Sequence, residues 1–269
     1  MRKYLLILPV VQIFIGCKKQ TDTPSPSTSP LLKDIVEEHW PSPYYHFEYD
    51  ASNRISLMSF ASDFNKYTVA YAEDRITDMK NTSVENRDRL QYIYNAEGRV
   101  DLIKYFDSTG NVYKTVDLFY DGSKLTRLYH SRRTAAGFVP EKAITMTYYA
   151  DSNLMDITYD LLPFDAVPGG TSSIHFEQYD NRINVDGFSL LKDELFNHQH
   201  LFLLPCVQLQ KNNPRKETRT GDGVNYTTDY TYTYNDKNAP LTKKGSRFIL
   251  NTGLAGQRFE TSSTFSYYQ

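Results

Sequence analysis

Polar and apolar side chains alternate with a period of two along much of this chain, and residues 225–234 show the pattern clearly. One set of alternate positions there is mainly aromatic, and its tyrosines are Tyr226, Tyr230, Tyr232 and Tyr234. The other set is polar, and it comprises Thr227, Asp229, Thr231 and Thr233. Successive side chains of a β-strand point to opposite faces of a sheet, so the segment is predicted to be a strand. Its threonine face is too polar for lipid, which argues against a membrane-spanning barrel.

A short motif recurs between the alternating segments. An aromatic strand ends in Tyr-Asp or Tyr-Asn, and a turn then leads to Arg-Ile or a close equivalent. Residues 47–55 and 92–100 match each other position for position. The tyrosines of the seven copies are Tyr49, Tyr71, Tyr94, Tyr120, Tyr149, Tyr179 and Tyr234. The first six are spaced by 22 to 30 residues, which indicates a repeated supersecondary unit.

Each copy has the composition of a β-hairpin, because Asp, Asn and Gly supply the turn and aromatic or β-branched residues flank it. Seven hairpins give about 14 strands, and a flat sheet with ~4.8 Å between strands would then be roughly 70 Å wide. Twisted open sheets seldom exceed about ten strands. We therefore predict an all-β fold, a large antiparallel meander of hairpin repeats that curls into a barrel or half-barrel.

One late segment breaks the period of two. Leu191, Leu195 and Phe202 lie near one helical stripe, and Pro205 is a natural stop after Leu204. The pattern predicts a helix over about 188–204, which we expect to pack on the concave face of the sheet.

The N-terminus has the layout of a secretory signal. Arg2 and Lys3 precede an apolar run over residues 5–15, which is too short to span a bilayer as a helix. Gly16 directly before Cys17 matches a lipobox, so residues 1–16 are predicted to be a lipoprotein signal peptide and Cys17 the site of lipid attachment. A cleaved signal with an incidental cysteine and a short anchor helix are the alternatives.

Residues 17–30 are polar and rich in proline, so they are predicted to form a disordered tether to a single β-domain over residues 31–269. Thirteen extended residues after Cys17 reach roughly 45 Å. Two or three acyl chains anchor a protein stably, so palmitate-type lipidation would attach the chain to a membrane without a spanning segment. No Asp follows Cys17 directly, which favours the outer membrane and leaves open the periplasmic face or the cell surface.

These features together resemble a known family. The motif Tyr49-Asp50 with Arg54-Ile55 looks like the Tyr-Asp (YD, Rhs-type) repeat. The lipobox, tether, hairpins, late apolar helix and Tyr/Thr-rich strand resemble a family of Bacteroidota lipoproteins whose domain of unknown function is described as porin-like. The resemblance implies a porin-like fold and an outer-membrane location, and the family has no established activity to carry over.

Charge and cysteine content exclude several classes of protein. The chain has 30 Lys and Arg against 32 Asp and Glu, which gives no electrostatic reason to bind nucleic acid. Only two cysteines are present, so acylation of Cys17 would leave Cys206 without an intramolecular disulfide partner. Because Cys206 follows the apolar run 201–204, we predict a buried packing residue there.

Candidate chemistry is sparse. His198 and His200 would face different sides of a helix, so a metal site formed by that pair is not expected. The sequence has no nucleophile elbow, P-loop, dinucleotide fingerprint or zincin motif. We expect neither an enzyme nor a bound cofactor.

Two function classes remain. The first is a non-enzymatic scaffold or accessory lipoprotein of the cell envelope. The alternative is a lipoprotein that binds a glycan or an apolar ligand on the concave face of the sheet, with Tyr226, Tyr230, Tyr232 and Tyr234 as a stacking platform. Tyrosines on one strand face also serve as core or as a cross-strand ladder. A glycan or another envelope protein would be the partner.

Overall fold

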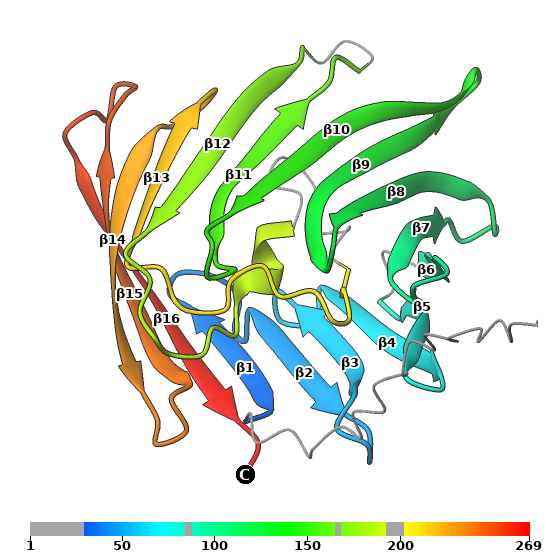
Figure 1. The fold of residues 1–269 in the computed structure, drawn as a ribbon, viewed down its shortest axis with the longest axis horizontal. Helices are drawn as coiled ribbons and strands as arrows, with labels where there is room; N and C mark the ends of the chain where they lie inside the picture. Colours follow the sequence, from blue (N-terminus) through cyan, green and yellow to red (C-terminus); the bar gives the residue numbers. More distant parts are fainter. Residues whose placement is uncertain (1–29, 84–87, 165–167, 192–201) are drawn as a thin grey trace, which may run out of the picture.

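The computed structural model describes residues 30–83, 88–164, 168–191 and 202–269, and these form a closed antiparallel barrel (Figure 1). Each strand pairs with its neighbours in sequence, and the first strand pairs with the last. The strands are β1 (Leu32–Glu37), β2 (Tyr45–Tyr49), β3 (Ile55–Phe60), β4 (Asn65–Ala72), β5 (Arg75–Asn81), β6 (Arg89–Tyr94), β7 (Val100–Phe106), β8 (Val112–Asp121), β9 (Lys124–Thr134), β10 (Gly137–Tyr148), β11 (Leu154–Leu161), β12 (Gly170–Glu177), β13 (Lys216–Gly221), β14 (Tyr226–Tyr234), β15 (Pro240–Ile249) and β16 (Arg258–Tyr267).

The predicted all-β antiparallel meander is confirmed, and its strand number and closure are corrected. The seven motif copies lie between β2 and β15, which accounts for the fourteen strands expected from the repeat. Strands β1 and β16 lie outside the repeat and carry no motif. They pair with each other, with Ile35 opposite Phe265, so the barrel closes with sixteen strands and is not a half-barrel.

Apolar side chains line the inside of the barrel along β2 to β12. Met58, Met79, Leu90, Ile103 and Leu128 are completely buried there. Their neighbours in sequence point outward and are mostly polar, such as Asp78 and Lys80 on either side of Met79. The core therefore lies inside the barrel.

The repeated tyrosines join consecutive hairpins at one end of the barrel. The hydroxyl of Tyr71 donates to the carbonyl of Ile55 over 2.9 Å, and that of Tyr94 donates to Ile76 over 2.9 Å. The same bond recurs from Tyr120 to Val100 and from Tyr179 to Leu154. In the fifth copy it comes from Tyr148, to Leu125, whereas Tyr149, named from the sequence, donates to the carbonyl of Phe176. In every case but that of Tyr149 the acceptor is the residue that follows the turn of the preceding motif. Burial, followed by nearby charges, raises the pKa of Tyr71 to about 12, so this hydroxyl stays protonated as a donor must.

In the first four motif copies, the cation stacks on a tyrosine of the next copy. The guanidinium carbon of Arg54 lies 4.4 Å from the Tyr71 ring centroid, and that of Arg75 lies 5.3 Å from Tyr94. Arg99 over Tyr120 and Lys124 over Tyr148 continue the series. Such contacts contribute about 0.5–1 kcal/mol each at exposed sites. The repeat thus encodes both the turn and the link to the next hairpin.

We expect Tyr94→Phe to lower the free energy of unfolding by about 1 kcal/mol, because the carbonyl of Ile76 loses its donor while the ring and its contact with Arg75 remain. Urea unfolding followed by circular dichroism measures the change. Tyr129→Phe on the outer wall is the matched control, and equal losses in the two variants would contradict the role given to Tyr94.

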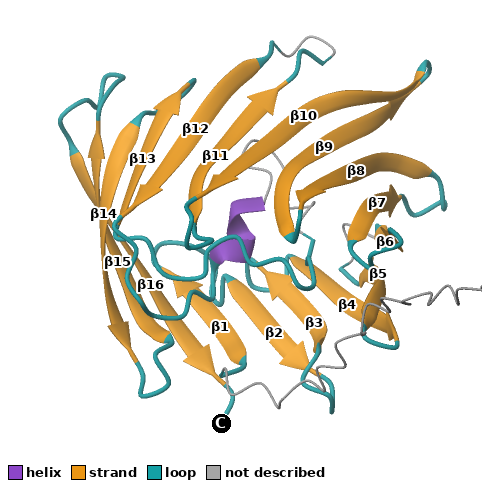
Figure 2. Cartoon of the chain, in the orientation of Figure 1, coloured by secondary structure: helices purple, strands orange, loops and turns teal. Residues whose placement is uncertain are grey.

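The connection between β12 and β13 enters the barrel (Figures 1 and 2). Its 3-10 helix η1 (Gly187–Leu191) packs the ring of Phe188 against Tyr45 and Phe47, with centroid distances of 5.1 and 5.5 Å. The hydroxyl of Tyr159 donates to the carbonyl of Leu190 over 2.7 Å. We call residues 178–191 and 202–215 the inner segment.

The predicted helix over 188–204 is wrong for the residues described. Only residues up to Leu191 adopt one short 3-10 turn, and 202–204 are not helical. Barrel tyrosines take the backbone bonds that a helix would need: Tyr159 binds the carbonyl of Leu190, and the Leu203 N–H donates to the hydroxyl of Tyr92. Residues 192–201, with His198 and His200, lie outside the described residues. Within the part of the chain that is described, no helix has the length and hydropathy to cross a bilayer.

Cys206 also departs from expectation. Its side chain is exposed, and the residue sits in a turn with φ of 63°. Leu204 and Val207 on either side pack against the core, but the turn at Pro205 and Cys206 points this one side chain outward. The prediction of a buried packing cysteine is therefore wrong.

Candidate functional site

The inner face of β13 to β16 differs from the rest of the barrel because it is polar and aromatic. We call this surface the polar wall. Its inward-facing residues, placed by strand register, are Glu217, Arg219, Tyr226, Thr228, Tyr230, Tyr232, Tyr234, Lys243, Gly245, Arg247, Phe259, Thr261 and Ser263.

The four tyrosines named from the sequence all lie on the polar wall, while the threonine face of β14 points outward. Tyr232 and Tyr234 stack, with ring centroids 6.0 Å apart and planes inclined by 22°. The hydroxyl of Tyr232 donates to the carbonyl of Pro214 over 2.9 Å, and that of Tyr234 donates to the carboxylate of Asp180. These two tyrosines therefore hold the inner segment in place.

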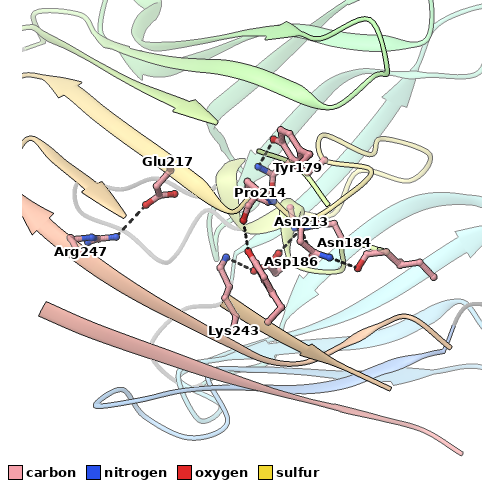
Figure 3. Close-up of polar contacts among 12 residues, drawn as sticks. Tyr179, Asn184, Asp186, Asn213, Pro214, Glu217, Lys243 and Arg247 are labelled. Atoms are coloured by element: carbon pink, nitrogen blue, oxygen red, sulfur yellow. Dashed lines mark hydrogen bonds and ion pairs between the residues drawn. The ribbon is translucent and has the colours of Figure 1, made fainter. Parts of the chain in front are cut away.

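An ion pair connects the inner segment to the polar wall (Figure 3). The Nζ of Lys243 lies 2.8 Å from Oδ2 of Asp186, and the side-chain amide of Asn184 donates to Oδ1 of the same carboxylate over 2.9 Å. The ammonium also lies 4.7 Å from the ring centroid of Tyr230.

The ion pair overcomes the effect of burial on both pKa values. Burial alone would raise the pKa of Asp186, but the charge of Lys243 and the hydrogen bonds from Lys243 and Asn184 hold it below the ordinary value. Burial would likewise lower the pKa of Lys243, yet Asp186 raises it. Both groups are charged at neutral pH.

A second charged pair lies four residues further along β15. Nη2 of Arg247 is 3.4 Å from Oε1 of Glu217, and Nε donates to Oγ1 of Thr228 over 3.2 Å. The guanidinium carbon lies 3.8 Å from the ring centroid of Tyr226. Stacking, an ion pair and a hydroxyl together hold the guanidinium of Arg247 in one position.

Gly245 lies between Tyr230 and Thr261 in the cross-strand register. A Cβ at this position would come within 2.6 Å of Oγ1 of Thr261, and within 2.9 Å of both Cγ2 of Thr228 and Cε1 of Tyr230. The absence of a side chain lets the Tyr230 ring lie close against the sheet.

Sequence reasoning found the tyrosines of the polar wall and missed its charges. Asp186, Glu217, Lys243 and Arg247 belong to no motif. The one available signal is that Lys243, Gly245 and Arg247 share a strand face by the period of two. The predicted lipid site, Cys17, lies outside the described residues.

Comparison with solved structures supports the fold. A porin-like protein from Bacteroides vulgatus is similar at 12% identity and a TM-score of 0.58, over 88% of this chain and 99% of that one. Another, from Bacteroides uniformis, shares 15% identity at a TM-score of 0.55, over 83% of this chain and 89% of that one. No family model and no curated protein matches the chain. At such low identities the similarity shows the fold alone, which is porin-like.

Proposed function

We propose that this chain is a lipid-anchored accessory or scaffold protein of the cell envelope, whose barrel sits in the aqueous phase beside the outer membrane rather than across it. It acts without a catalytic step. The observation that carries the proposal is the chemistry of the outer wall.

The outward-facing positions carry charges around most of the barrel. These residues include Asp34, Glu48, Lys66, Asp78, Arg89, Lys104, Asp117, Arg127, Asp156, Lys216, Asp229, Lys244 and Glu260. A Lys or Arg on a lipid-facing strand costs about 2–4 kcal/mol at the bilayer midplane. A few such residues would offset the whole stability of a typical domain, about 5–15 kcal/mol.

The positions of the first and last strands also support a barrel that is tethered beside the membrane. β1 begins and β16 ends at the same end of the barrel, where the N–H of Tyr268 donates to the carbonyl of Leu31 over 2.9 Å. A tether over residues 17–30 would therefore join the barrel beside a pair of strands already locked by β1–β16 pairing. A barrel that is attached to the membrane through one lipid anchor does not need an outward-facing apolar band to stay there.

The deciding experiment is Cys17→Ser in the native host, with Cys206→Ser as the matched control. We expect Cys17→Ser to abolish acyl labelling and to release the protein from membranes on a carbonate wash, while Cys206→Ser keeps both. A barrel that spans the membrane would stay in the washed membrane fraction after Cys17→Ser, and that outcome would refute the proposal.

A further inference from the structure

Most of the large apolar side chains that stay exposed in the described part of the chain lie at one end of the barrel. Odd-numbered strands of the antiparallel meander all run in the same direction, so the turns that follow β1, β3, β13 and β15 lie at the same end. Each of these four turns carries a large apolar side chain that keeps 41% to 56% of its surface exposed, and the set is Trp40, Phe64, Val224, Leu250 and Leu254. We call these five residues the apolar rim. Phe138 and Phe259, each one residue into a strand, are exposed at the same end.

The four turns of the apolar rim are neighbours around the barrel. The N–H of Ser62 donates to the carbonyl of Pro43 over 3.0 Å, which joins the turn after β3 to the turn after β1. The N–H of Leu250 donates to the carbonyl of Asn225 over 2.8 Å, which joins the turn after β15 to the turn after β13. Strands β16 and β1 pair with each other between these two pairs of turns. The apolar rim is therefore one continuous arc, and an exposed apolar surface of this kind marks an interaction site.

The charges on the same four turns are few and are not basic. Residues 38–44, 61–64, 222–225 and 250–257 contain no Lys or Arg. Their acidic residues are Glu38, Asp63 and Asp222; Asp63 lies 3.5 Å from Lys66, and Asp222 accepts a hydrogen bond from the Thr171 N–H over 2.7 Å. An anionic surface would therefore find no cation to attract it here, so the surface that the apolar rim fits has apolar character and no net negative charge.

The predicted tether is long enough for the apolar rim to reach the membrane that holds the anchor. It joins the barrel at Leu31, before the start of β1 and at the end opposite the rim. β15 and β16 have ten residues each, so they are at most ~33 Å long, and less along the barrel axis because strands tilt. The thirteen residues between Cys17 and Leu31 span up to ~45 Å when extended. The anchor and the apolar rim can therefore contact the same bilayer.

A bilayer fits the apolar rim better than a folded partner does. The side chains stand on four separate turns, and a protein partner would have to match all of them with a surface packed as tightly as a protein interior. A fluid bilayer accommodates each one separately, and Trp is enriched at membrane–water interfaces. The ring of Trp40 lies 5.7 Å from that of the buried Tyr44, so it is held in place although it is exposed.

We propose that the apolar rim inserts into the interfacial layer of a zwitterionic bilayer, so that the barrel stands on the membrane at this end. Trp40, Phe64 and Leu254 enter the boundary between headgroups and acyl chains, and the charged outer wall stays in water. The inference rests on the proposed function, because the lipid anchor supplies the high local concentration at which a shallow contact is effective.

The fluorescence of Trp40, the only tryptophan in the chain, tests the inference. The protein is the chain from residue 17 with Cys17→Ser, which keeps every described residue but has neither the lipid anchor nor the apolar leader. It is mixed with vesicles of phosphatidylethanolamine and phosphatidylcholine, with and without phosphatidylglycerol. We expect the emission to move to shorter wavelength and a nitroxide-labelled lipid to quench it, with or without the anionic lipid.

Two double variants locate the contact. Phe64→Gln with Leu254→Gln should lower the partition coefficient onto vesicles, measured by flotation, roughly tenfold or more. Phe119→Gln with Leu241→Gln is the matched control, because it removes a Phe and a Leu that are 48% and 40% exposed away from the rim, against 51% and 45% for Phe64 and Leu254. The control should bind vesicles as the Cys17→Ser chain does.

Several results would overturn the inference. One is an emission of Trp40 that vesicles neither shift nor quench, and another is an equal loss of binding in the two double variants. Binding that requires phosphatidylglycerol would mean that a cationic surface makes the contact. A shift that depends on protein concentration without vesicles would assign the apolar rim to a second copy of the chain. A spanning barrel would stay on the vesicles through a carbonate wash, which releases a rim contact, so a failure of the proposed function is a separate outcome.

Discussion

Lys243→Met is expected to lower the free energy of unfolding by about 3 kcal/mol at neutral pH. Methionine matches the length of the lysine stem but leaves the carboxylate of Asp186 inside the barrel without its cation. Removing one partner of a buried pair costs about 3–5 kcal/mol, because the remaining charge stays desolvated. The side chains of Lys243 and Asp186 keep 22% and 16% exposure, so we expect the lower end of that range.

The effect of Lys243→Met depends on pH with a definite sign. The pKa of Asp186 is lowered in the folded chain, so its contribution is present above the ordinary value of about 3.9 and is lost as pH falls through the folded pKa. The pKa of Lys243 is raised, so its contribution is present below about 10.4 and is lost as pH rises through the folded pKa. The gap between the variant and the unaltered chain should therefore shrink below about pH 4.

Urea unfolding at pH 3 and pH 7 measures this gap. Lys244→Met is the matched control, since Lys244 is the next residue on β15 and points into water, where a change of about 0.5 kcal/mol or less is expected. Asp186→Asn added to Lys243→Met removes the stranded charge and should restore part of the loss. If the two lysine variants lose the same free energy at pH 7, the ion pair does not stabilise the fold.

The strands were readable from the sequence because each hairpin repeats the same local physics. The turn residues, the flanking alternation and the tyrosine spacing recur in copies such as 47–55 and 92–100. Strands β1 and β16 carry no motif, and their pairing joins residues more than 220 positions apart, such as Ile35 and Phe265. Local patterns hold no information about that contact, so closure could not be derived from them.

The sixth motif copy shows why a helix was predicted where the chain forms the inner segment. Tyr179 makes the same kind of bond as Tyr71 and Tyr94, here to the carbonyl of Leu154, but residues 180–183 open into the barrel instead of closing a hairpin. The apolar residues that follow satisfy the periodicity of a helix. In the folded chain they are placed by individual contacts, such as Phe188 with Tyr45, which have no period.

The charged pairs at the polar wall could not be predicted for the same reason, because they depend on contacts between residues far apart in the sequence. The four tyrosines could be assigned to one face because they share a strand and a parity. Asp186 and Lys243 are 57 residues apart and meet only because the inner segment enters the barrel. Their pairing depends on tertiary structure, and neither residue is distinguished by its neighbours in sequence.

Gly245→Val should lower the free energy of unfolding by about 2–3 kcal/mol, although valine ordinarily favours a strand over glycine. An added Cβ would approach Thr261 Oγ1 to 2.6 Å and both Thr228 and Tyr230 to 2.9 Å. The valine side chain would thus be enclosed on three sides. To make room, the Tyr230 ring would have to move away from Lys243, whose Nζ lies 4.7 Å from the ring centroid. The steric cost therefore outweighs the usual gain of about 0.5–1 kcal/mol from removing a strand glycine.

Gly253→Val is the matched control for Gly245→Val, because a Cβ at Gly253 meets nothing within 4 Å. Urea unfolding of both variants, read by circular dichroism, should show a loss at position 245 and a change of about 0.5 kcal/mol or less at position 253. Adding Thr261→Ala removes the nearest obstructing atom and should recover part of the loss. Equal stability of the two valine variants would mean that Tyr230 does not lie against the sheet at Gly245, and the packing of the polar wall would have to be revised.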